Sequence, residues 1–383
     1  MPHELTEQNV WLLISSTLAM LTVPGVALFY GGMVRGKNVL NTMGLPLLAL
    51  ALASLEWVLW GEALVFGSSG AEAGPTLMMH TFSSSLALAL VAGALVERIR
   101  FAFFLVFGML WLTVVYMPVA HWLWGGGWLA RLGGMDFAGG AVVHITAGVT
   151  ALVAAVMVGP RRGYGRVEMR PHNIPLSVCG GAFLWVGWCG FSAGWGVASM
   201  TTVTGAFVAI QVAAAAAALT WTAAETLQRD KPTVLGTVSG AVAGLVAVAP
   251  AAGYVGPLSA IVIGIGAGGA CYMVVNFVKP ILGYDDSLDV FGMHAVGGTW
   301  GMVAAGLFAS TAVNPDGSDG LFYEYPYQFG VQLAAVMAVW AYTAVVTFLL
   351  VKALTAVMPA RVDDDAELVG LDLAQHDERG CWV

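Results

Sequence analysis

The feature that most constrains this chain is a series of long apolar runs that recurs from one end of the sequence to the other. An α-helix needs about 20 predominantly apolar residues to cross the roughly 30 Å hydrocarbon core of a bilayer. These runs predict an all-α polytopic membrane protein with eleven transmembrane helices. They lie approximately at residues 9–31, 41–66, 78–97, 101–124, 139–159, 174–196, 201–228, 233–249, 255–277, 290–310 and 327–357.

The composition agrees with a membrane protein and excludes an ordinary soluble domain. Of the 383 residues, 58% are hydrophobic and only 10% are charged, whereas a soluble domain has about 25% charged residues. No hydrophilic segment interrupts the runs, so we expect one membrane domain, residues 1–358, and a cytoplasmic tail, residues 359–383. Most acidic residues lie in loops and in this tail, so the net charge of −8 says little about partners. No nucleic acid is expected to bind.

The lysines and arginines alternate between loops in a way that predicts the orientation of the chain. Loops after odd-numbered runs carry them, as does the C-terminal region, whereas only Arg131 follows an even-numbered run. Positive residues are enriched on the cytoplasmic side of membrane proteins. We therefore expect the N-terminus outside and the C-terminus in the cytoplasm. The residues are Arg35, Lys37, Arg98, Arg100, Arg161, Arg162, Arg166, Arg170, Arg229, Lys231, Lys279, Lys352, Arg361 and Arg379.

Two histidines inside apolar runs suggest an internal repeat. His144 lies in "DFAGGAVVHITAG" at the start of the fifth run, and His294 lies in "DVFGMHAVGGTWG" at the start of the tenth. Each has an acid at the mouth of its run, Asp136 and Asp289. Because five is an odd number, a second copy of the unit is inverted in the membrane. We expect inverted repeats, runs 1–5 and 6–10, plus a long eleventh helix, with the functional site where the halves meet.

A buried histidine pair has a specific use in a membrane. Two adjacent imidazoles can share a proton, one ring nitrogen donating while the other accepts. Burying a bare cation costs several kcal/mol, whereas an ammonium ion can lose its proton for about 3 kcal/mol near neutral pH. A narrow apolar conduit with such a pair would pass ammonia and reject potassium. The alternative is that each histidine bonds a neighbouring helix carbonyl independently.

Several ordered segments give the chain a specific resemblance along nearly all of its length. It resembles the ammonium transporter family (the Amt/Mep/Rh superfamily), and is most similar to the bacterial and archaeal Amt members. The resemblance implies a homotrimer of eleven-helix protomers, each with its own pore. The segments are "LFYGGMVRGKNVLN", "GALVERIRF", "HWLWGGGWLA", "DFAGGAVVHI", "PHNIPL", "GWCGFSAG", "KPTVLGTVSGAVAGLVAVAPAAGYVGP", "DVFGMHAVGGTWG" and "GLDLAQHDERG".

The resemblance assigns roles to residues that match the family's motifs. It implies that His144 and His294 are the twin pore histidines and that Asp136 is the acid near the outer mouth. It also implies that Trp124, in "WGGG", lines the outer ammonium-recruitment site and that Phe191, in "GFSAG", is one of two gate phenylalanines. From the residues alone, Asp136 is equally explained as a helix cap and Trp124 as an interfacial belt residue.

Three positions depart from the family pattern at the predicted entrance. Trp195 stands where the recruitment serine is expected, and Ala249 replaces a threonine. The second gate phenylalanine falls on Ser83, with Phe82 one residue round the helix. One hypothesis is that the aromatic cap is relocated, with Trp195 stacking on the ion beside Trp124 and with Ser83 leaving room. The rival is that recruitment is weakened or lost.

Two acids in the second run, in "SLEWVLWGEALVF", also need an explanation. Glu56 lies near mid-span and Glu62 lies nearer the outside. A carboxylate at that depth is expensive, so Glu56 is expected to be protonated or paired, and an accessory role in attracting cations or relaying a proton is one possibility. Glu225 is expected to pair with a neighbouring base, and His121 to bond locally.

The sequence thus predicts an ammonium transporter or ammonia channel in the inner (cytoplasmic) cell membrane. A non-transporting ammonium receptor, or a transporter with altered range such as alkylamines, is the alternative. An intramembrane metalloenzyme is a third hypothesis, but the chain lacks an HExxH motif and a third ligand at suitable spacing, so no metal, cofactor or enzyme activity is expected. The tail resembles the region that supports regulation by PII proteins, although Asp377 and Cys381 depart from the usual residues.

Overall fold

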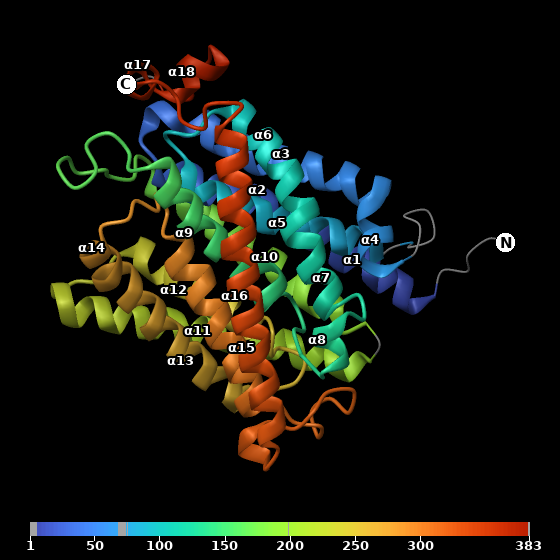
Figure 1. The fold of residues 1–383 in the computed structure, drawn as a ribbon. Coiled ribbons are helices and arrows are strands. Elements are labelled where there is room, and N and C mark those ends of the chain that lie inside the picture. Colours follow the sequence, from blue (N-terminus) through green and yellow to red (C-terminus); the bar gives the residue numbers. More distant parts are fainter. Residues whose placement is uncertain (1–5, 68–73, 75, 198, 382–383) are drawn as a thin grey trace.

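The computed structural model describes residues 6–67, 74, 76–197 and 199–381. This part of the chain is helical and contains no β-strand; the only pairing of extended backbone in it is an isolated bridge between Ile99 and Arg361. The helices form one bundle in which α16 runs along the outside and the C-terminal helices lie across one end (Figure 1). The all-helical class predicted from the sequence is confirmed.

The helices of the first half are often interrupted by short π-helical turns. In chain order they are α1 (Glu7–Met20), α2 (Thr22–Met33), η1 (Gly36–Asn38), α3 (Val39–Glu56), η2 (Trp57–Gly61), α4 (Glu62–Phe66), α5 (Thr76–Leu95), α6 (Phe101–Trp111), η3 (Leu112–Tyr116), α7 (Met117–Leu123), α8 (Trp128–Arg131), η4 (Gly140–Ile145) and α9 (Thr146–Val158).

The second half repeats much of this plan. Its helices are α10 (Ile174–Trp195), α11 (Met200–Arg229), α12 (Val234–Val248), α13 (Pro257–Met273), η5 (Val274–Val278), α14 (Lys279–Leu282), η6 (Phe291–Ala295), α15 (Val296–Phe308), η7 (Leu321–Tyr323) and α16 (Pro326–Thr355). The tail forms α17 (Asp364–Val369) and α18 (Leu371–His376).

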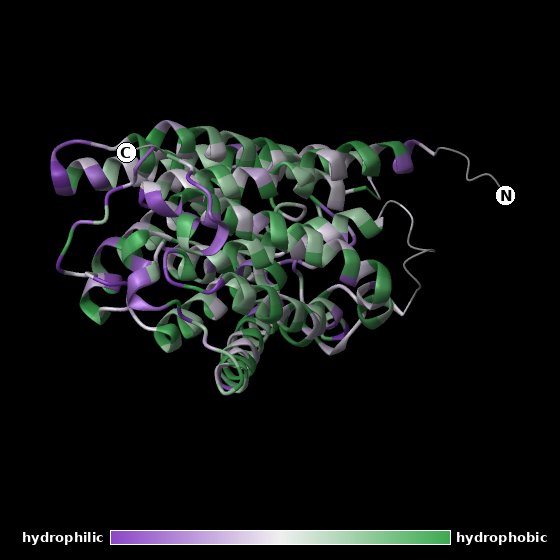
Figure 2. Cartoon of the chain, turned by 90° about the horizontal axis from the view of Figure 1, so that it is seen from above, coloured by the Kyte–Doolittle hydropathy of each residue, from purple (hydrophilic) through white to green (hydrophobic). Residues whose placement is uncertain are grey.

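Nine helical stretches of the described residues are long and apolar enough to cross a membrane. The other two predicted runs correspond to α12, which has 15 residues, and to the η6–α15 stretch, where glycines and a histidine lower the hydropathy. Apolar residues cover the lengths of the helices, and hydrophilic residues gather toward the end that carries the tail (Figure 2). The protein is therefore a multi-pass membrane protein.

The two halves meet through glycines that allow their backbones to touch. A Cβ on Gly148 of α9 would lie 2.2 Å from the Ala295 backbone nitrogen, and one on Gly298 of α15 would lie 2.5 Å from the Gly140 oxygen. Only residues without a side chain fit such contacts, which are typical of packed membrane helices. The interface therefore holds η4 and α9 against η6 and α15 at close range.

A buried guanidinium ties distant loops together at the end of the bundle that carries the tail. Arg161 bonds Asp285 through Nε and Nη2 and bonds Glu97 through Nη1 at 2.7 Å. Glu97 also accepts hydrogen bonds from Arg35 and Asn38. Burial alone would raise the pKa of Glu97 and of Asp285, but the neighbouring guanidinium groups hold both pKa values below their ordinary range.

The tail is bonded to the loop that joins α2 and α3. The Asp372 carboxylate accepts the Asn41 backbone N–H at 2.8 Å, and the Leu371 N–H is donated to the Asn38 side chain. Lys37 donates to the Glu367 carbonyl, and the Glu367 carboxylate pairs with a guanidinium from the preceding segment. The tail is therefore a fixed part of this end of the protein (Figure 1).

We expect Arg161→Ala to be severely destabilising, because Asp285 loses its ion pair and Glu97 loses one of its two guanidinium partners. Losing one partner of a buried pair typically costs about 3–5 kcal/mol. Thermal unfolding of the purified protein in detergent measures the loss. Arg162→Ala is the matched control, since this neighbour is half exposed and its guanidinium lies 3.8 Å from Asp364. Equal melting temperatures for the two variants would contradict a stabilising role for the ion pairs of Arg161.

The same ion pairs of Arg161 predict that the stability of the protein depends on pH. Because the pKa values of Glu97 and Asp285 are lowered in the folded protein, their contribution to stability is complete at neutral pH. It is lost as the pH falls below about 4, where the unfolded chain takes up protons first. Unfolding midpoints should therefore decrease steeply in acid for the wild type, and much less for Arg161→Ala. A parallel decrease in both proteins would show that the ion pairs of Arg161 are not the origin of the pH dependence.

Candidate functional site

Two imidazole rings face each other where the halves of the protein meet. His144 lies in η4 and His294 in η6, and their ring centroids are 5.3 Å apart with a 25° angle between the planes. His144 is fully buried and His294 is 3% exposed. The structure thus brings together the two histidines singled out from the sequence, which are 150 residues apart.

Asp136 fixes the start of η4, and so the direction of the His144 ring. Its Oδ1 accepts the backbone N–H groups of Gly139 and Gly140, and its Oδ2 accepts those of Ala141 and Val142. A helix start otherwise leaves such groups without partners, which is costly in hydrocarbon. This geometry is that of a helix cap. It agrees with the explanation of Asp136 that was derived from the residues without the family resemblance.

The acid that corresponds to Asp136 in the second half is Asp286, not the Asp289 suggested by the sequence pattern. Asp286 Oδ2 accepts the Phe291 N–H at 2.7 Å at the start of η6, whereas Asp289 forms an ion pair with Lys279. Asp136 precedes its histidine by eight residues, and Asp286 does the same. The eight-residue spacing to His294 was visible in the sequence. The prediction chose Asp289 because it lies at the mouth of the tenth run.

Several polar atoms around the histidines have no hydrogen-bond partner among the described residues. They include both ring nitrogens of His144, Nδ1 of His294, Nε1 of Trp188 and Oγ of Ser192. Trp188 stacks on His144 at 5.0 Å with an 18° angle. The alternative in which each histidine bonds a helix carbonyl is therefore wrong for His144. Buried polar groups without partners are rare in proteins. Here they are available to form hydrogen bonds with a small polar molecule.

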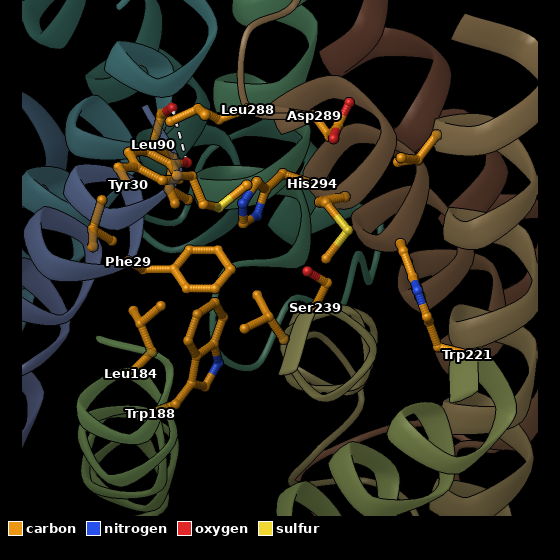
Figure 3. Close-up of a pocket in the computed structure, with 15 residues that line it drawn as sticks. Phe29, Tyr30, Leu90, Leu184, Trp188, Trp221, Ser239, Leu288, Asp289 and His294 are labelled. Carbon is orange, nitrogen blue, oxygen red and sulfur yellow. Dashed lines mark hydrogen bonds between the residues drawn. The ribbon is translucent and has the colours of Figure 1, made fainter. Parts of the chain in front are cut away.

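A cavity reaches His294 from the end of the bundle that carries the tail. Figure 3 shows Phe29, Trp188 and His294 on its walls, with Ser239 and Trp221 farther along. Its lining is mostly apolar. The histidine pair therefore has an approach from this side that is lined by hydrophobic side chains.

A second hollow, the vestibule, lies on the opposite side of the histidines and is lined by aromatic rings and carboxylates. Trp124 and Trp195 lie at its floor with their centroids 4.6 Å apart, and Trp124 Nε1 donates to the Asp136 carbonyl at 2.7 Å. The other lining residues include Phe66, Phe137, Tyr254, Asp136, Asn314 and Asp316. Trp195 therefore faces the vestibule and not the lipid.

Phe191 is buried beside Trp195. It meets the indole edge-on at 6.2 Å and is 2% exposed. Trp188, Phe191 and Trp195 recur along α10 at helical spacing, so they lie on one face of that helix. This face runs from the vestibule to the histidine pair.

Known proteins are similar to this chain over nearly all of its length. The sequence profile of the Ammonium Transporter Family matches residues 10–381. The chain belongs to the ammonium transporter family. It is 42% identical to the ammonium transporter of Bacillus subtilis (97% of each chain) and 42% identical to ammonium transporter Amt1 of Archaeoglobus fulgidus (98% of this chain, 99% of that one).

Solved structures agree with the family. Candida albicans Mep2 matches with a TM-score of 0.88 at 33% identity, covering 97% of this chain and 90% of that one. A structure named Sensor Amt Protein matches with a TM-score of 0.88 at 25% identity, covering 96% and 98%. The resemblance recognised in the sequence is confirmed.

This ammonium transporter family member differs from the expected pattern at the remaining sequence-predicted positions. Ser83 is buried and its Oγ donates to the Met79 carbonyl, and Phe82, on the same helix, is 9% exposed. Neither residue lines the vestibule. Ala249 contributes its carbonyl, which accepts the Ala138 N–H. The ring that contacts Phe191 here is Trp195.

Glu56 lies apart from the vestibule. Its Oε2 accepts a hydrogen bond from Thr113 in η3 at 3.1 Å, while Oε1 has no partner among the described residues. Two other expectations are met: Glu225 lies 3.7 Å from Arg229, and the His121 ring contacts the Val65 carbonyl.

His80 of α5 was not among the residues predicted from the sequence. Its Nδ1 lies 2.9 Å from Glu62 Oε2, and its ring stacks on Phe66 at 4.2 Å. Phe66 lines the vestibule. A histidine in the third apolar run, together with an acid in the second, was the signal available. Whether Glu62 and His80 meet depends on the register between their two helices. Neither apolar run indicates that register.

We expect Asp136→Ala to destabilise the protein by more than an ordinary cap, which contributes about 0.5–2 kcal/mol, because four N–H groups lose their acceptor. Asp136→Asn keeps one carbonyl oxygen and should lie between Ala and the wild type. Asp365→Ala, on the exposed side of α17, is the control. Melting temperatures of the purified variants test this order, and an Asp136→Ala protein as stable as the control would refute it.

Proposed function

We propose that the protein is an ammonium transporter that recruits NH₄⁺ in the vestibule, removes a proton there and conducts NH₃ past His144 and His294. The observation that carries the proposal is the buried, face-to-face pair of imidazoles with unpartnered nitrogens. Such nitrogens can donate to and accept from a small polar molecule. Solid-supported-membrane currents, described below, distinguish conduction of NH₃ alone from conduction with a separately relayed proton.

The selection depends on the cost of charge. The region between the vestibule and the histidines is formed by Phe191 and Trp188, which offer no counter-charge to a cation. Losing a proton costs ammonium about 3 kcal/mol near neutral pH, and potassium has no such option. An uncharged molecule meets polar partners at the histidines without the penalty of a buried ion.

Recruitment is assigned to the two indoles at the floor of the vestibule. A cation over an indole face gains about 0.5–2 kcal/mol, and the carboxylate of Asp316 in the vestibule adds attraction at longer range. The contact between Trp195 and Trp124 supports the relocated aromatic cap over lost recruitment.

The membrane arrangement follows the same proposal. We place the N-terminus outside and the C-terminus in the cytoplasm, with α12 and the η6–α15 stretch completing eleven transmembrane helices. Inverted repeats are supported by equal spacing: residues 136, 144 and 148 correspond to 286, 294 and 298, with an Asp, a His and a Gly at each pair. The π-helical turns η4 and η6 also correspond.

The assembly and its setting are proposed from the family. We propose a homotrimer in the inner (cytoplasmic) cell membrane, with residues 1–358 as the transport domain and 359–383 as a regulatory tail that a PII protein recognises. The ordered contacts of α18 with the α2–α3 loop support a regulatory role, because they connect the tail to the membrane domain. A transporter of this design performs no enzymatic reaction.

An ammonium receptor without net flux is the second candidate. Trp195, Ala249 and Ser83 change the entrance together, and one similar structure is named Sensor Amt Protein. An intramembrane metalloenzyme has less support, because the described residues contain no group of three or more potential metal ligands. A current or uptake evoked by an ammonium pulse on proteoliposomes separates a transporter from a receptor, which would bind ammonium and pass none.

We expect purified protein in proteoliposomes to transport ammonium and methylammonium and to exclude potassium. The double variant His144→Ala, His294→Ala removes the polar partners of ammonia, so ammonium flux should decrease at least tenfold. Solid-supported-membrane currents together with methylammonium uptake measure this. Wild-type ammonium flux with potassium still excluded in the double variant would count against the role of the pair.

We also expect Trp195→Ala to raise the half-saturating ammonium concentration by about 3- to 30-fold, which corresponds to one lost cation–π contact. The matched control is Trp185→Ala on the same helix, because Trp185 donates to Gln211 away from the vestibule. Uptake curves for the two variants give the comparison. An unchanged half-saturating concentration in Trp195→Ala would favour the rival view that recruitment at this site is lost.

A further inference from the structure

A second pair of titratable side chains lies directly behind the vestibule and has no part in the mechanism above. Glu62 begins α4 and His80 lies in the first turns of α5, and the distance from His80 Nδ1 to Glu62 Oε2 is 2.9 Å. The side chains are only 9% and 4% exposed for His80 and Glu62, respectively. An acid and a histidine buried together in a membrane protein are expensive, and they indicate a function.

Three aromatic rings enclose the imidazole. Phe66 stacks on it at 4.2 Å with an 18° angle, and the Trp57 and Trp195 centroids lie at 5.4 Å and 5.6 Å. Aromatic faces attract cations, and a carboxylate at hydrogen-bond distance does so more strongly. The surroundings of the His80 ring are therefore ones that attract positive charge.

Trp195 belongs both to the aromatic cage around His80, formed by Phe66, Trp57 and Trp195, and to the lining of the vestibule. Its indole centroid lies 5.6 Å from that of the His80 ring and 4.6 Å from that of Trp124, and Trp195 also lines the vestibule. Phe66 is shared in the same way. A positive charge on His80 and a positive charge in the vestibule would thus both lie close to Trp195, in partly buried surroundings where like charges repel more strongly than in water.

We infer that a proton on the Glu62–His80 pair and an ammonium ion in the vestibule oppose each other's binding. The inference rests on the proposed recruitment at Trp124 and Trp195. Coupling between two sites is reciprocal: protonation of His80 weakens ammonium binding, and ammonium binding expels the proton from the imidazole into the outer water. The pair makes recruitment sensitive to the acidity outside the cell.

Other charged groups near the cage have different partners. In the vestibule, Asp136 is bonded to four backbone N–H groups, and Asp316 lines the far wall. Both line the same hollow as Trp195, and burial raises the pKa of the Asp136 carboxyl to about 6. Neither carboxylate is altered in the His80 variants described below, so a pH dependence that disappears in His80→Gln is assigned to the Glu62–His80 pair.

The elements packed against α5 supply few other titratable groups. These groups are Glu7 at the exposed start of α1, Tyr30 of α2, which donates to the Leu90 carbonyl, Glu56 of α3, which accepts from Thr113, Tyr116 of η3, which meets Trp57 edge-on, and His144 of η4, which stacks on Trp188. Glu7 is exposed, and each of the others has a contact other than the imidazole of His80. Histidine is also the side chain that ordinarily titrates between about pH 5 and 8.

The test is uptake of radiolabelled methylammonium into proteoliposomes, with the outside pH varied between about 5.5 and 8 and the inside pH fixed. For the wild type we expect the half-saturating concentration to rise about tenfold toward the acid end. His80→Gln cannot be protonated but still donates to Glu62, so its half-saturating concentration should stay at the alkaline value throughout. His80→Lys keeps a cation beside Glu62 and should show the acid value at every pH.

The matched control is His121→Gln, the same substitution at a histidine that contacts the Val65 carbonyl, and it should retain the wild-type pH dependence. The maximal rate should change little in His80→Gln, which a merely structural role would not predict. A full acid-side rise in His80→Gln overturns the inference. If the wild type shows no saturable uptake at any pH, the proposed transport function fails instead.

A measurement on the wild type alone makes the test independent of how the variants fold. Ammonium chloride added to the purified protein in weakly buffered solution near about pH 6.5 should release protons, detected with a pH dye, whereas potassium chloride should release none. No release above a protein-free blank, with ammonium binding shown in the same sample, would also overturn the inference.

Discussion

The structure depends on one constraint: in hydrocarbon, a backbone that leaves the regular α-helix must find its hydrogen bonds elsewhere. Asp136 and Asp286 meet this requirement where η4 and η6 begin, by accepting N–H groups that would otherwise have no partner. Only because these starts are capped can each π-helical turn aim its histidine at the other half. The glycines that follow then bring the two turns into contact. The functional pair is thus a consequence of backbone chemistry.

Much of this could be predicted from the sequence, for identifiable reasons. The apolar runs are long and depend only on local composition, so the all-helical class follows directly. His144 and His294 stand out because polar residues are rare in such runs. The predicted runs 233–249 and 290–310 also coincide closely with α12 and with the η6–α15 stretch, although both stretches are short or rich in glycine. Asp289 was predicted in place of Asp286 because it stands at the mouth of the tenth run, whereas the eight-residue spacing to the histidine, shared by Asp136 and Asp286, was the informative signal.

The vestibule shows the complementary limit. Trp195 and Ser83 were recognised as departures, but their relation to each other is a matter of contact between α10 and its neighbours. Likewise, Glu62 was visible as an acid in a membrane span, while His80, its partner, lies 18 residues farther along on another helix. Pairings between helices depend on register and rotation. One sequence carries no direct record of either.

The way in which the halves are held together has a consequence for the connection between them. They are joined through the Gly148 and Gly298 contacts and through Arg161, which lies at the end of the first half and reaches Asp285 in the second. The connector that follows, residues 163–170, is mostly exposed. Chain continuity there adds little to what surface complementarity already provides. Two separately encoded fragments divided in this connector would therefore reassemble in the bilayer, and an ancestor built from two independent polypeptides is physically reasonable.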